Sequence, residues 1–376
     1  MNFRGPLIEA MLAEGHEVLA LAPQADDGTR AWLARHGVAF HPIPLSRAGL
    51  SPLGDFATYS AIRSVLRHVR PDIVVGYTIK AVIYGMLAAK AAAVPVRCAM
   101  ITGLGYAFTD GDASLKRRMV GRVARGLYAL ALRQAQVAIF QNPDDLALFR
   151  KLSLLAEGTR VGIVNGSGVD TRHFALSPLP SEPVCLMISR LVADKGVVEF
   201  LMAAKQVKAK RPDVRFVLIG PTDPNPAALP TGLLETSIAE GVVDYRGEVF
   251  DVRPAIAACS IYVLPSYREG TPRSVLEAMS MGRPVVTTDA PGCRETVTDN
   301  LNGLLVPVRS ADDLAAAIIR LSDDGALRAR FGEAGREMAV ARYDASKVAR
   351  SVLELLRLAP EPSLSVIEHE GQSGYR

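Results

Sequence analysis

The stretch PSYREGTPRSVLEAMSMGRPVVTTDAPGCRETV, residues 265–297, carries the strongest signal for the fold of this chain. It starts where the apolar run 261–264 ends, and β-rich residues return at 284–289. Between these runs, Thr271 suits an N-cap and Pro272 suits a first helical turn, so we expect a strand, a loop, a helix and another strand. The amide groups of that first turn would point back to the strand end, where they attract phosphate.

The same alternation of strands and helices extends over the second half of the chain. Short β-rich runs, mostly separated by helix-period segments, lie at 184–189, 215–220, 261–265, 284–289 and 303–306. Parallel strands need crossover connections, so this pattern predicts a parallel sheet covered on both faces. We expect a Rossmann-like α/β domain over residues 184–344.

The first half predicts a second Rossmann-like domain, over residues 1–166. Candidate strands lie in HEVLALAP (16–23), DIVVGYT (72–78), PVRCAMITG (95–103) and QVAIFQN (136–142). Helical stretches such as 55–68 and 81–92 separate them. The usual first strand is expected to be missing, because residues 6–14 already have a helical pattern. Either the translation start lies further upstream or the chain is truncated, and we favour the first explanation.

Length also indicates two domains, since 376 residues exceed one ordinary core. The polar, proline-containing residues 167–183 are expected to form the linker, with a cleft opening beside them. Ligands should bind in that cleft, beyond the carboxyl ends of the strands. The helix at 345–358 is expected to cross back onto the first domain, and residues 360–376 are expected to be disordered.

Composition narrows the classes of protein. Hydrophobic residues make up 49% of the chain and the net charge is only +4, so we expect a folded, soluble protein whose charge does not select a partner. The apolar stretches 81–103 and 127–140 contain charged residues, so neither predicts a membrane span, and the first residues lack a secretory signal. The cysteines are widely spaced and form no C-x-x-C pair, which favours free thiols in a reducing cytoplasm: Cys98, Cys185, Cys259 and Cys293.

No metal is expected. The six histidines show no metal-ligand spacing. The triplet Asp110-Gly111-Asp112 fits the D-x-D pattern of many metal-dependent transferases, but it is short enough to arise by chance.

Two glutamates of the opening stretch, Glu269 and Glu277, could reach different parts of one extended ligand, since carboxylates accept hydrogen bonds from ribose or sugar hydroxyls. Alone, they would indicate a helix with two solvated glutamates. However, PSYREGTPRSVLEAMSMGRPVV closely resembles the donor-site motif of glycosyltransferase family four, which has the GT-B fold. The resemblance implies that Glu269 faces the donor sugar, that Glu277 binds the ribose, and that Gly270 and Thr271 donate backbone hydrogen bonds to the diphosphate. Pro272 and Arg273 belong to the same expected nucleotide-binding set.

A second match is SRLVADKGVVEFLMAAK, residues 189–205. In the family, the cations equivalent to Arg190 and Lys195 hold the diphosphate, and they replace a metal ion. Placed in a first helical turn, Lys195 would oppose the helix macrodipole by a few tenths of a kcal/mol unless an anion compensates. The alternative is an ordinary exposed cation.

A third match is VNGSGVDTRHF, residues 164–174, which resembles the interdomain turn of the family. Its glycines would let the chain approach the cleft, and Asn165 and Gly166 are placed in the expected donor site. A plain linker is an equally good interpretation of these residues.

Four stretches of the first half, FRGPLIEAM (3–11), YTIKAVIYG (77–85), ITGLGYAFTD (101–110) and residues 141–145, resemble family-four enzymes that assemble bacterial polyprenyl-diphosphate-linked oligosaccharides, capsules and O-antigens. Many such enzymes have a histidine where this chain has Thr102, so no histidine base is expected there. Strand ends and loop starts facing the cleft are the candidate acceptor site: Arg4, Thr78, Lys80, Thr102 and Gly103. The threonines could equally be strand-end caps, and Lys80 a solvated helix-start residue.

The segment 114–134 has arginines on one helical side and apolar residues mostly elsewhere, so it either touches an anionic membrane or is an ordinary surface helix. Together these resemblances predict a retaining, metal-independent transferase that moves a hexose or N-acetylhexosamine from a UDP-sugar to a polyprenyl-diphosphate-linked saccharide. It would act peripherally at the cytoplasmic membrane face, with no cofactor beyond the donor and no nucleic-acid partner. A nucleotide-sugar isomerase and a noncatalytic nucleotide-sugar-binding subunit are the alternatives.

Overall fold

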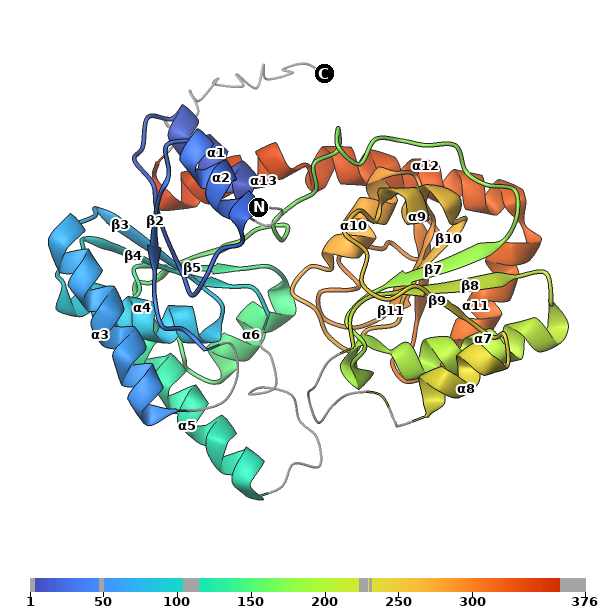
Figure 1. The fold of residues 1–376 in the computed structure, drawn as a ribbon, viewed down its shortest axis with the longest axis horizontal. Helices are drawn as coiled ribbons and strands as arrows, with labels where there is room; N and C mark the ends of the chain where they lie inside the picture. Colours follow the sequence, from blue (N-terminus) through green and yellow to red (C-terminus); the bar gives the residue numbers. More distant parts are fainter. Residues whose placement is uncertain (1–3, 47–50, 104–114, 223–228, 230–231, 359–376) are drawn as a thin grey trace, which may run out of the picture.

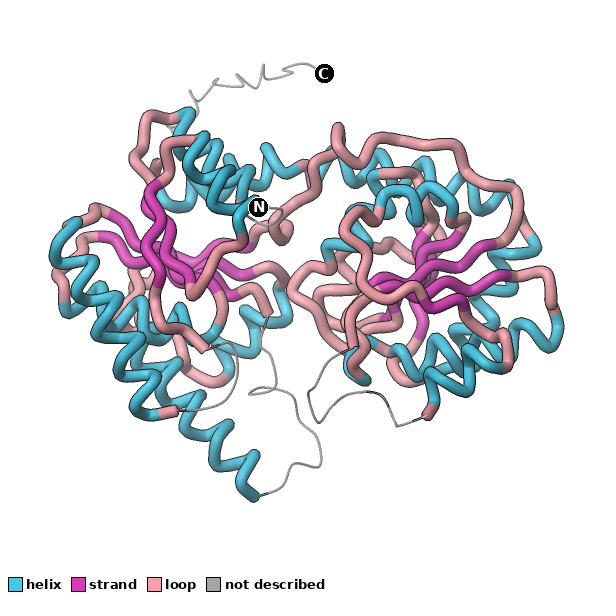
Figure 2. Tube along the Cα trace, in the orientation of Figure 1, coloured by secondary structure: helices cyan, strands magenta, loops and turns pink. Residues whose placement is uncertain are grey.

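The structure, a computed structural model, describes residues 4–46, 51–103, 115–222, 229 and 232–358. The Asp110-Gly111-Asp112 triplet and the predicted tail at 360–376 lie outside these residues. The described chain forms two α/β lobes side by side, the first coloured blue to green and the second green to red (Figure 1). In each lobe the strands lie inside, with helices on both faces (Figure 2).

The second domain contains one parallel sheet with the strand order β12-β11-β10-β7-β8-β9. Its strands are β7 Val184–Ile188, β8 Arg215–Ile219, β9 Asp244–Tyr245, β10 Ile261–Leu264, β11 Val285–Thr288 and β12 Gly303–Val306. Its helices are α7 Val197–Lys210, α8 Leu233–Ala239, α9 Arg253–Ala258, α10 Arg273–Ser280, α11 Ala311–Asp323 and α12 Gly325–Arg342. All five predicted strands are confirmed. Every residue of β10 and β11 is buried, as expected for strands covered on both faces.

The first domain has its parallel strands in two sheets, one with the order β1-β2 and one with the order β3-β4-β5-β6. The strands are β1 Leu19–Ala22, β2 Ala39–Pro42, β3 Ile73–Tyr77, β4 Val96–Ile101, β5 Val137–Phe140 and β6 Arg160–Ile163. The helices are α1 Gly5–Ala13, α2 Asp27–Arg35, α3 Pro52–Val69, α4 Ile79–Ala91, α5 Leu115–Leu132 and α6 Pro143–Lys151. Within the described part, no strand precedes α1 and no strand pairing joins β1 to β3. In the described part, the first domain therefore has its parallel strands divided between two sheets.

The last helix, α13 Ala345–Leu356, crosses back to the first domain as predicted. It packs on α1, and its apolar residues share a core with Leu7, Cys98 and Val137. The helix ends two residues before the predicted boundary of 358, because Arg357 adopts a left-handed backbone conformation with φ 59°.

The chain crosses between the domains twice, and the two crossings lie side by side. Val169 forms an isolated parallel bridge with Asp344, through hydrogen bonds of 2.8 Å to the carbonyl oxygen of Tyr343 and 2.9 Å from the amide of Ala345. A side chain at Gly168, whose φ is 70°, would place its Cβ 2.6 Å from the Cα of Ala345. Glycine is therefore required where the crossings touch.

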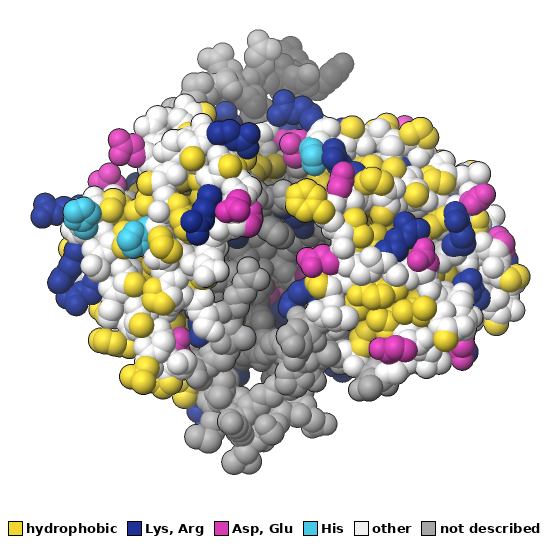
Figure 3. Space-filling model, in the orientation of Figure 1, with side chains coloured by type: hydrophobic (Ala, Val, Ile, Leu, Met, Phe, Trp, Pro, Cys, Tyr) yellow, Lys and Arg dark blue, Asp and Glu magenta, His cyan; other side chains and the backbone are white. Residues whose placement is uncertain are grey.

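Two surface findings bear on partners. None of the described helices is both long and apolar enough to cross a membrane. On the face drawn in Figure 3, acidic and basic side chains are interspersed over both lobes, so that face carries no single-sign field. The four cysteines are all buried free thiols, as predicted.

Candidate functional site

The site lies where the carboxyl ends of the sheet β12-β11-β10-β7-β8-β9 and of the sheet β3-β4-β5-β6 meet. In the second domain, β10 pairs with β7, so the loop 265–272 after β10 lies beside the residues that follow β7. In the first domain, β4 pairs with β5, which brings Thr102 and Gln141 to one edge. Parallel strands thus gather the predicted loops at one place between the domains.

The start of α10 differs from the prediction. Thr271 is not the N-cap: α10 begins at Arg273, and the N-cap is Pro272, with an extended backbone of φ −72° and ψ 106° and no side-chain capping bond. The Thr271 hydroxyl instead donates to the carbonyl oxygen of Gln141 at 3.3 Å. Because no side chain in the described chain caps α10, its first amide groups are available to an anion.

Glycines allow the loop to press against the first domain. A side chain at Gly270 would collide with the carbonyl oxygen of Thr102, and the backbone nitrogen of Gly270 would lie 3.7 Å from a Cβ built on Gly103. At Gly166, where φ is 69°, a Cβ would lie 2.7 Å from the Cβ of Thr271. The structure therefore brings predicted donor-side and acceptor-side residues into direct contact.

Lys195 and Glu269 form an ion pair at the centre of this contact. The Nζ of Lys195 lies 2.5 Å from the Oε1 of Glu269, and the two side chains are only 22% and 13% exposed. The sequence predicts Lys195 in the first turn of a helix, but in the structure Lys195 precedes α7 and ends a short 3₁₀ turn, Ala193–Lys195. Gly196, with φ 74°, separates that turn from α7, and it fits there because a side chain would collide with the carbonyl group of Pro265.

Arg190 and Glu277 lie in the segments of the second domain that follow β7 and β10. Arg190 is exposed and follows β7, whose last residue, Ile188, accepts a hydrogen bond from Ser274 of α10 at 3.3 Å. Glu277 is buried and its Oε1 accepts from the Nε of Arg273 at 2.8 Å. Burial raises the pKa of Glu277, and the charge of Arg273 opposes that shift.

Two of the predicted site residues, Asn165 and Arg4, make their contacts away from the Lys195–Glu269 pair. The amide of Asn165 donates to the carbonyl oxygen of Arg342 at 2.9 Å, so this side chain ties the two interdomain crossings together. The Arg4 guanidinium lies 3.7 Å from the centroid of the Tyr77 ring and donates to the Ser167 hydroxyl at 3.1 Å. Burial lowers the pKa of Arg4.

The start of α4 is more constrained than the sequence indicates. Thr78 occupies the N-cap position without a capping bond, with φ 69° and ψ 161°, a conformation that is strained for a β-branched residue. Lys80 is not a solvated residue: its Nζ lies 2.8 Å from Asp55, and the two side chains are 14% and 12% exposed. Asp55 is buried and was not among the predicted site residues.

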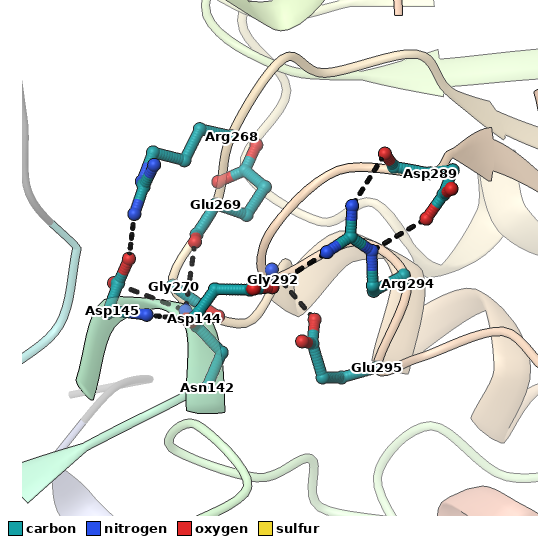
Figure 4. Close-up of polar contacts among 10 residues, drawn as sticks. All are labelled: Asn142, Asp144, Asp145, Arg268, Glu269, Gly270, Asp289, Gly292, Arg294 and Glu295. Atoms are coloured by element: carbon teal, nitrogen blue, oxygen red, sulfur yellow. Dashed lines mark hydrogen bonds and ion pairs between the residues drawn. The ribbon is translucent and has the colours of Figure 1, made fainter. Parts of the chain in front are cut away.

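Sequence reasoning also missed the residues at the start of α6 that contact the loop 265–272, the predicted donor loop (Figure 4). The amide of Asn142 donates to the backbone carbonyl oxygens of Gly270 and Glu269, at 3.1 and 3.3 Å, and Arg268 forms an ion pair with Asp145. The available signal was the N-P-D-D sequence after a strand, which is typical of a helix start but does not reveal the cross-domain contacts.

Comparison with known proteins places the chain in a family. Residues 5–165 match the model for a glycosyl transferase 4-like domain, and residues 182–324 match the model for glycosyl transferases group 1. The chain is 31% identical over 368 residues, covering 94% of each chain, to the N,N'-diacetylbacillosaminyl-diphospho-undecaprenol alpha-1,3-N-acetylgalactosaminyltransferase of Campylobacter jejuni. It is 26% identical over 321 residues to the UDP-Gal:alpha-D-GlcNAc-diphosphoundecaprenol alpha-1,3-galactosyltransferase of Escherichia coli, covering 82% of this chain and 78% of that one.

A solved structure agrees on the fold. Anabaena HepE in complex with UDP matches with a TM-score of 0.72 at 21% identity, covering 94% of this chain and 96% of that one. The two family models together span both lobes, and the relative from Campylobacter jejuni aligns along nearly the whole chain. The chain therefore belongs to glycosyltransferase family four and is a glycosyltransferase with the GT-B fold.

Proposed function

We propose that this glycosyltransferase moves a hexose or N-acetylhexosamine from a UDP-sugar to a hydroxyl of a polyprenyl-diphosphate-linked saccharide, with retention of configuration and without a metal. The observation that carries the proposal is the Lys195–Glu269 pair, which puts a cation and a carboxylate beside the uncapped start of α10. The cation and the uncapped helix start suit a diphosphate, and the carboxylate suits the hydroxyl groups of a sugar. The similarity to a relative named as acting on a diphospho-undecaprenol saccharide supports the acceptor class.

The donor diphosphate would bind between Arg190, Lys195 and the first amide groups of α10. There, the two cations and the helix start would stabilise the charge that develops on the leaving diphosphate. They supply the positive charge that a metal provides in other transferases, so the proposed mechanism needs no cofactor besides the donor. Glu269 would accept hydrogen bonds from the sugar hydroxyls and Glu277 from the ribose, with Gly270 donating from its backbone.

On the acceptor side we propose Thr102, Gly103, Thr78, Lys80 and Arg4. Thr102 and Gly103 adjoin the donor loop, and Lys80 lies in the first turn of α4, where a cation and a helix N-terminus suit an acceptor diphosphate. The guanidinium of Arg4 contacts Tyr77, which ends β3, and Ser167.

We further propose a peripheral position on the cytoplasmic face of the membrane. The helices α3 and α5 both pack on α4, and both carry exposed apolar side chains. On α3, Leu53 and Phe56 are 86% and 68% exposed, and on α5, Val123 and Leu130 are 52% and 47% exposed. Sedimentation with vesicles tests this position. We expect retention on phosphatidylglycerol vesicles, loss on phosphatidylcholine vesicles, and loss of binding on replacing Leu53 and Phe56 by Ser. Equal recovery with both lipids would contradict it.

Offering a panel of UDP- and GDP-sugars, with and without polyprenyl-diphosphate-linked saccharides, tests the reaction itself. We expect label from a UDP-sugar to appear in the lipid fraction only when the acceptor is present. Conversion of the donor without an acceptor would favour an isomerase, and donor binding without any transfer would favour a noncatalytic binding subunit. In the same assay, Lys195→Ala should lose most of the transfer activity, because it removes a cation from the proposed diphosphate site. Lys205→Ala is the matched control, because Lys205 is 68% exposed and pairs with Glu240 on the surface.

A further inference from the structure

The start of α6 in the first domain is built to hold another part of the chain. Asn142 is the N-cap of α6, and its Oδ1 accepts from the amide of Asp145 at 2.8 Å. This cap uses only the oxygen of the side chain. The Nδ2 group is left to donate to the Oδ2 of Asp145 at 3.2 Å and, across the interface, to the backbone carbonyls of Gly270 and Glu269. Both Asn142 and Asp145 are fully buried.

Asp145 needs a partner from the second domain. Burial raises the pKa of its carboxyl group, and Arg268 and Asn142 oppose that shift. The ion pair with Arg268 supplies the charge that a fully buried carboxylate requires, and loss of one member of such a pair is strongly destabilising. The two domains are thus joined at the residue that immediately precedes Glu269.

The backbone of Glu269 is consequently fixed from both domains. Its amide donates to the carbonyl oxygen of Pro291 at 2.9 Å, and its own carbonyl oxygen accepts from Asn142 at 3.3 Å. Gly292, with φ 82°, has no room for a side chain against the same carbonyl group. With its main chain held in this way, Glu269 directs its carboxylate toward Lys195.

A second interdomain pair lies one residue away and serves as a comparison. Arg294 and Asp144 are 2.9 Å apart, but they are 37% and 38% exposed, and Arg294 also pairs with Asp289 (Figure 4). Exposed pairs of this kind contribute little to stability. Among the hydrogen bonds of the described residues, none joins Asp144 to the backbone of Glu269.

We infer that Asn142 and Asp145 are positioning residues for the donor loop, which hold Glu269 and Gly270 in place from the opposite domain. This inference rests on the proposed donor site for its effect on transfer. The first domain would then contribute to donor binding without touching the donor, and the contact between the two domains would be a condition for the correct placement of Glu269.

The test uses Asp145→Asn, which keeps the shape of the side chain but removes its charge, and Asn142→Ser, which keeps a capping oxygen but removes the amide donor. Asp144→Asn is the matched control. We expect kcat to fall on the order of 100-fold in the first two variants, as small misplacements of reacting groups produce, and to stay within about twofold in the control. In a Glu269→Gln background, Asp145→Asn and Asn142→Ser should each cause a clearly smaller loss than in wild type, because both act in part through Glu269.

Hydrogen exchange of the peptide covering residues 266–276 gives a readout that does not depend on transfer. We expect faster exchange in Asp145→Asn and Asn142→Ser than in wild type, and no change in Asp144→Asn. If wild type transfers no sugar, the proposed function fails while the exchange data still decide the positioning role. Unchanged exchange with kcat near wild type, or losses that multiply with that of Glu269→Gln, would overturn the inference. Should Asp145→Asn not fold, Asn142→Ser carries the same two outcomes.

Discussion

Removing either member of the Lys195–Glu269 pair should slow transfer, but the two removals should have different effects on UDP binding. The Nζ of Lys195 lies 2.5 Å from the Oε1 of Glu269. A diphosphate that recruits Lys195 must therefore compete with Glu269. We expect Lys195→Ala to weaken UDP binding, whereas Glu269→Gln should leave it equal or tighter.

The magnitudes follow from the burial of the pair. Removing one preorganised donor from a developing charge costs about 10²–10³ in kcat, or about 2.7–4 kcal/mol, so Lys195→Ala should lose that much turnover. A hydrogen bond to a charged group is worth about 1.5–3 kcal/mol, so UDP affinity should fall about 10- to 100-fold. Lys195 is 22% exposed, and solvent therefore reaches the pair, so in Glu269→Gln the gain in UDP affinity should not exceed about fivefold, or roughly 1 kcal/mol.

Three measurements separate these effects. Calorimetry gives the affinity for UDP, initial rates with a labelled UDP-sugar give kcat, and circular dichroism gives the melting temperature. For domains of this size a change of 1 kcal/mol moves the melting temperature by about 2–4 °C, so larger losses would indicate misfolding rather than a chemical effect. Lys205→Ala should match wild type in all three.

Two results would refute the reasoning. Turnover of Lys195→Ala within about threefold of wild type would remove Lys195 from the stabilisation of the leaving group, since that role requires at least about 100-fold. A loss of UDP affinity in Glu269→Gln equal to that in Lys195→Ala would show that the two side chains bind the nucleotide together instead of competing.

Three further predictions concern the packing, the acceptor side and the surface. Gly166→Ala should lower the free energy of unfolding by about 1–3 kcal/mol in urea titrations, because φ is 69° and the new Cβ would lie 2.7 Å from that of Thr271; unchanged stability would contradict the close approach. Lys80→Met should raise KM for the lipid-linked acceptor about tenfold, as expected for the loss of one charged hydrogen bond, while UDP affinity measured by calorimetry stays constant. Hydrogen bonds from Arg253 lower the pKa of Asp251 from 3.8 to about 2, so the stability that this pair contributes is present above pH 3.8 and is lost as the pH falls toward 2. NMR titration of Arg253→Gln should find the pKa of that carboxyl group raised from about 2 toward 3.8, because the guanidinium is lost while the backbone amide at position 253 still donates to it.

The fold was predictable where strands are continuous apolar runs. β10, with the sequence IYVL, and β11, with VVTT, are buried at every position, and each was recognised. β2, with the sequence AFHP, was missed because it is mostly exposed and contains histidine and proline. β6 contains arginine and glycine, and β9 has only two residues, so neither forms an apolar run.

The candidate site was predictable only as a set of residues. The motif around Glu269 and the cation at Lys195 were recognised, but their pairing depends on the close approach of Gly196 to Pro265, which joins distant parts of the chain. The N-cap prediction for Thr271 was wrong for a similar reason. Its hydroxyl could either accept from a backbone amide of the helix start or donate to a carbonyl oxygen elsewhere. The first domain supplies that carbonyl oxygen, on Gln141, and the local sequence does not contain it.

The contacts of Glu269 bear on the free energy of donor binding. A loop that lacked partners would have to be ordered by the donor, and part of the binding free energy would be lost in ordering it. Here the Glu269 backbone is already held by Pro291 and Asn142, and its carboxylate by Lys195. In the proposed donor site, the donor would therefore need to replace one ion pair rather than build the site, because the diphosphate would bind Lys195 while the sugar hydroxyls would bind Glu269. The affinity of Glu269→Gln for UDP measures the free energy of that replacement directly, since this variant retains the loop and the cation but lacks the competing charge.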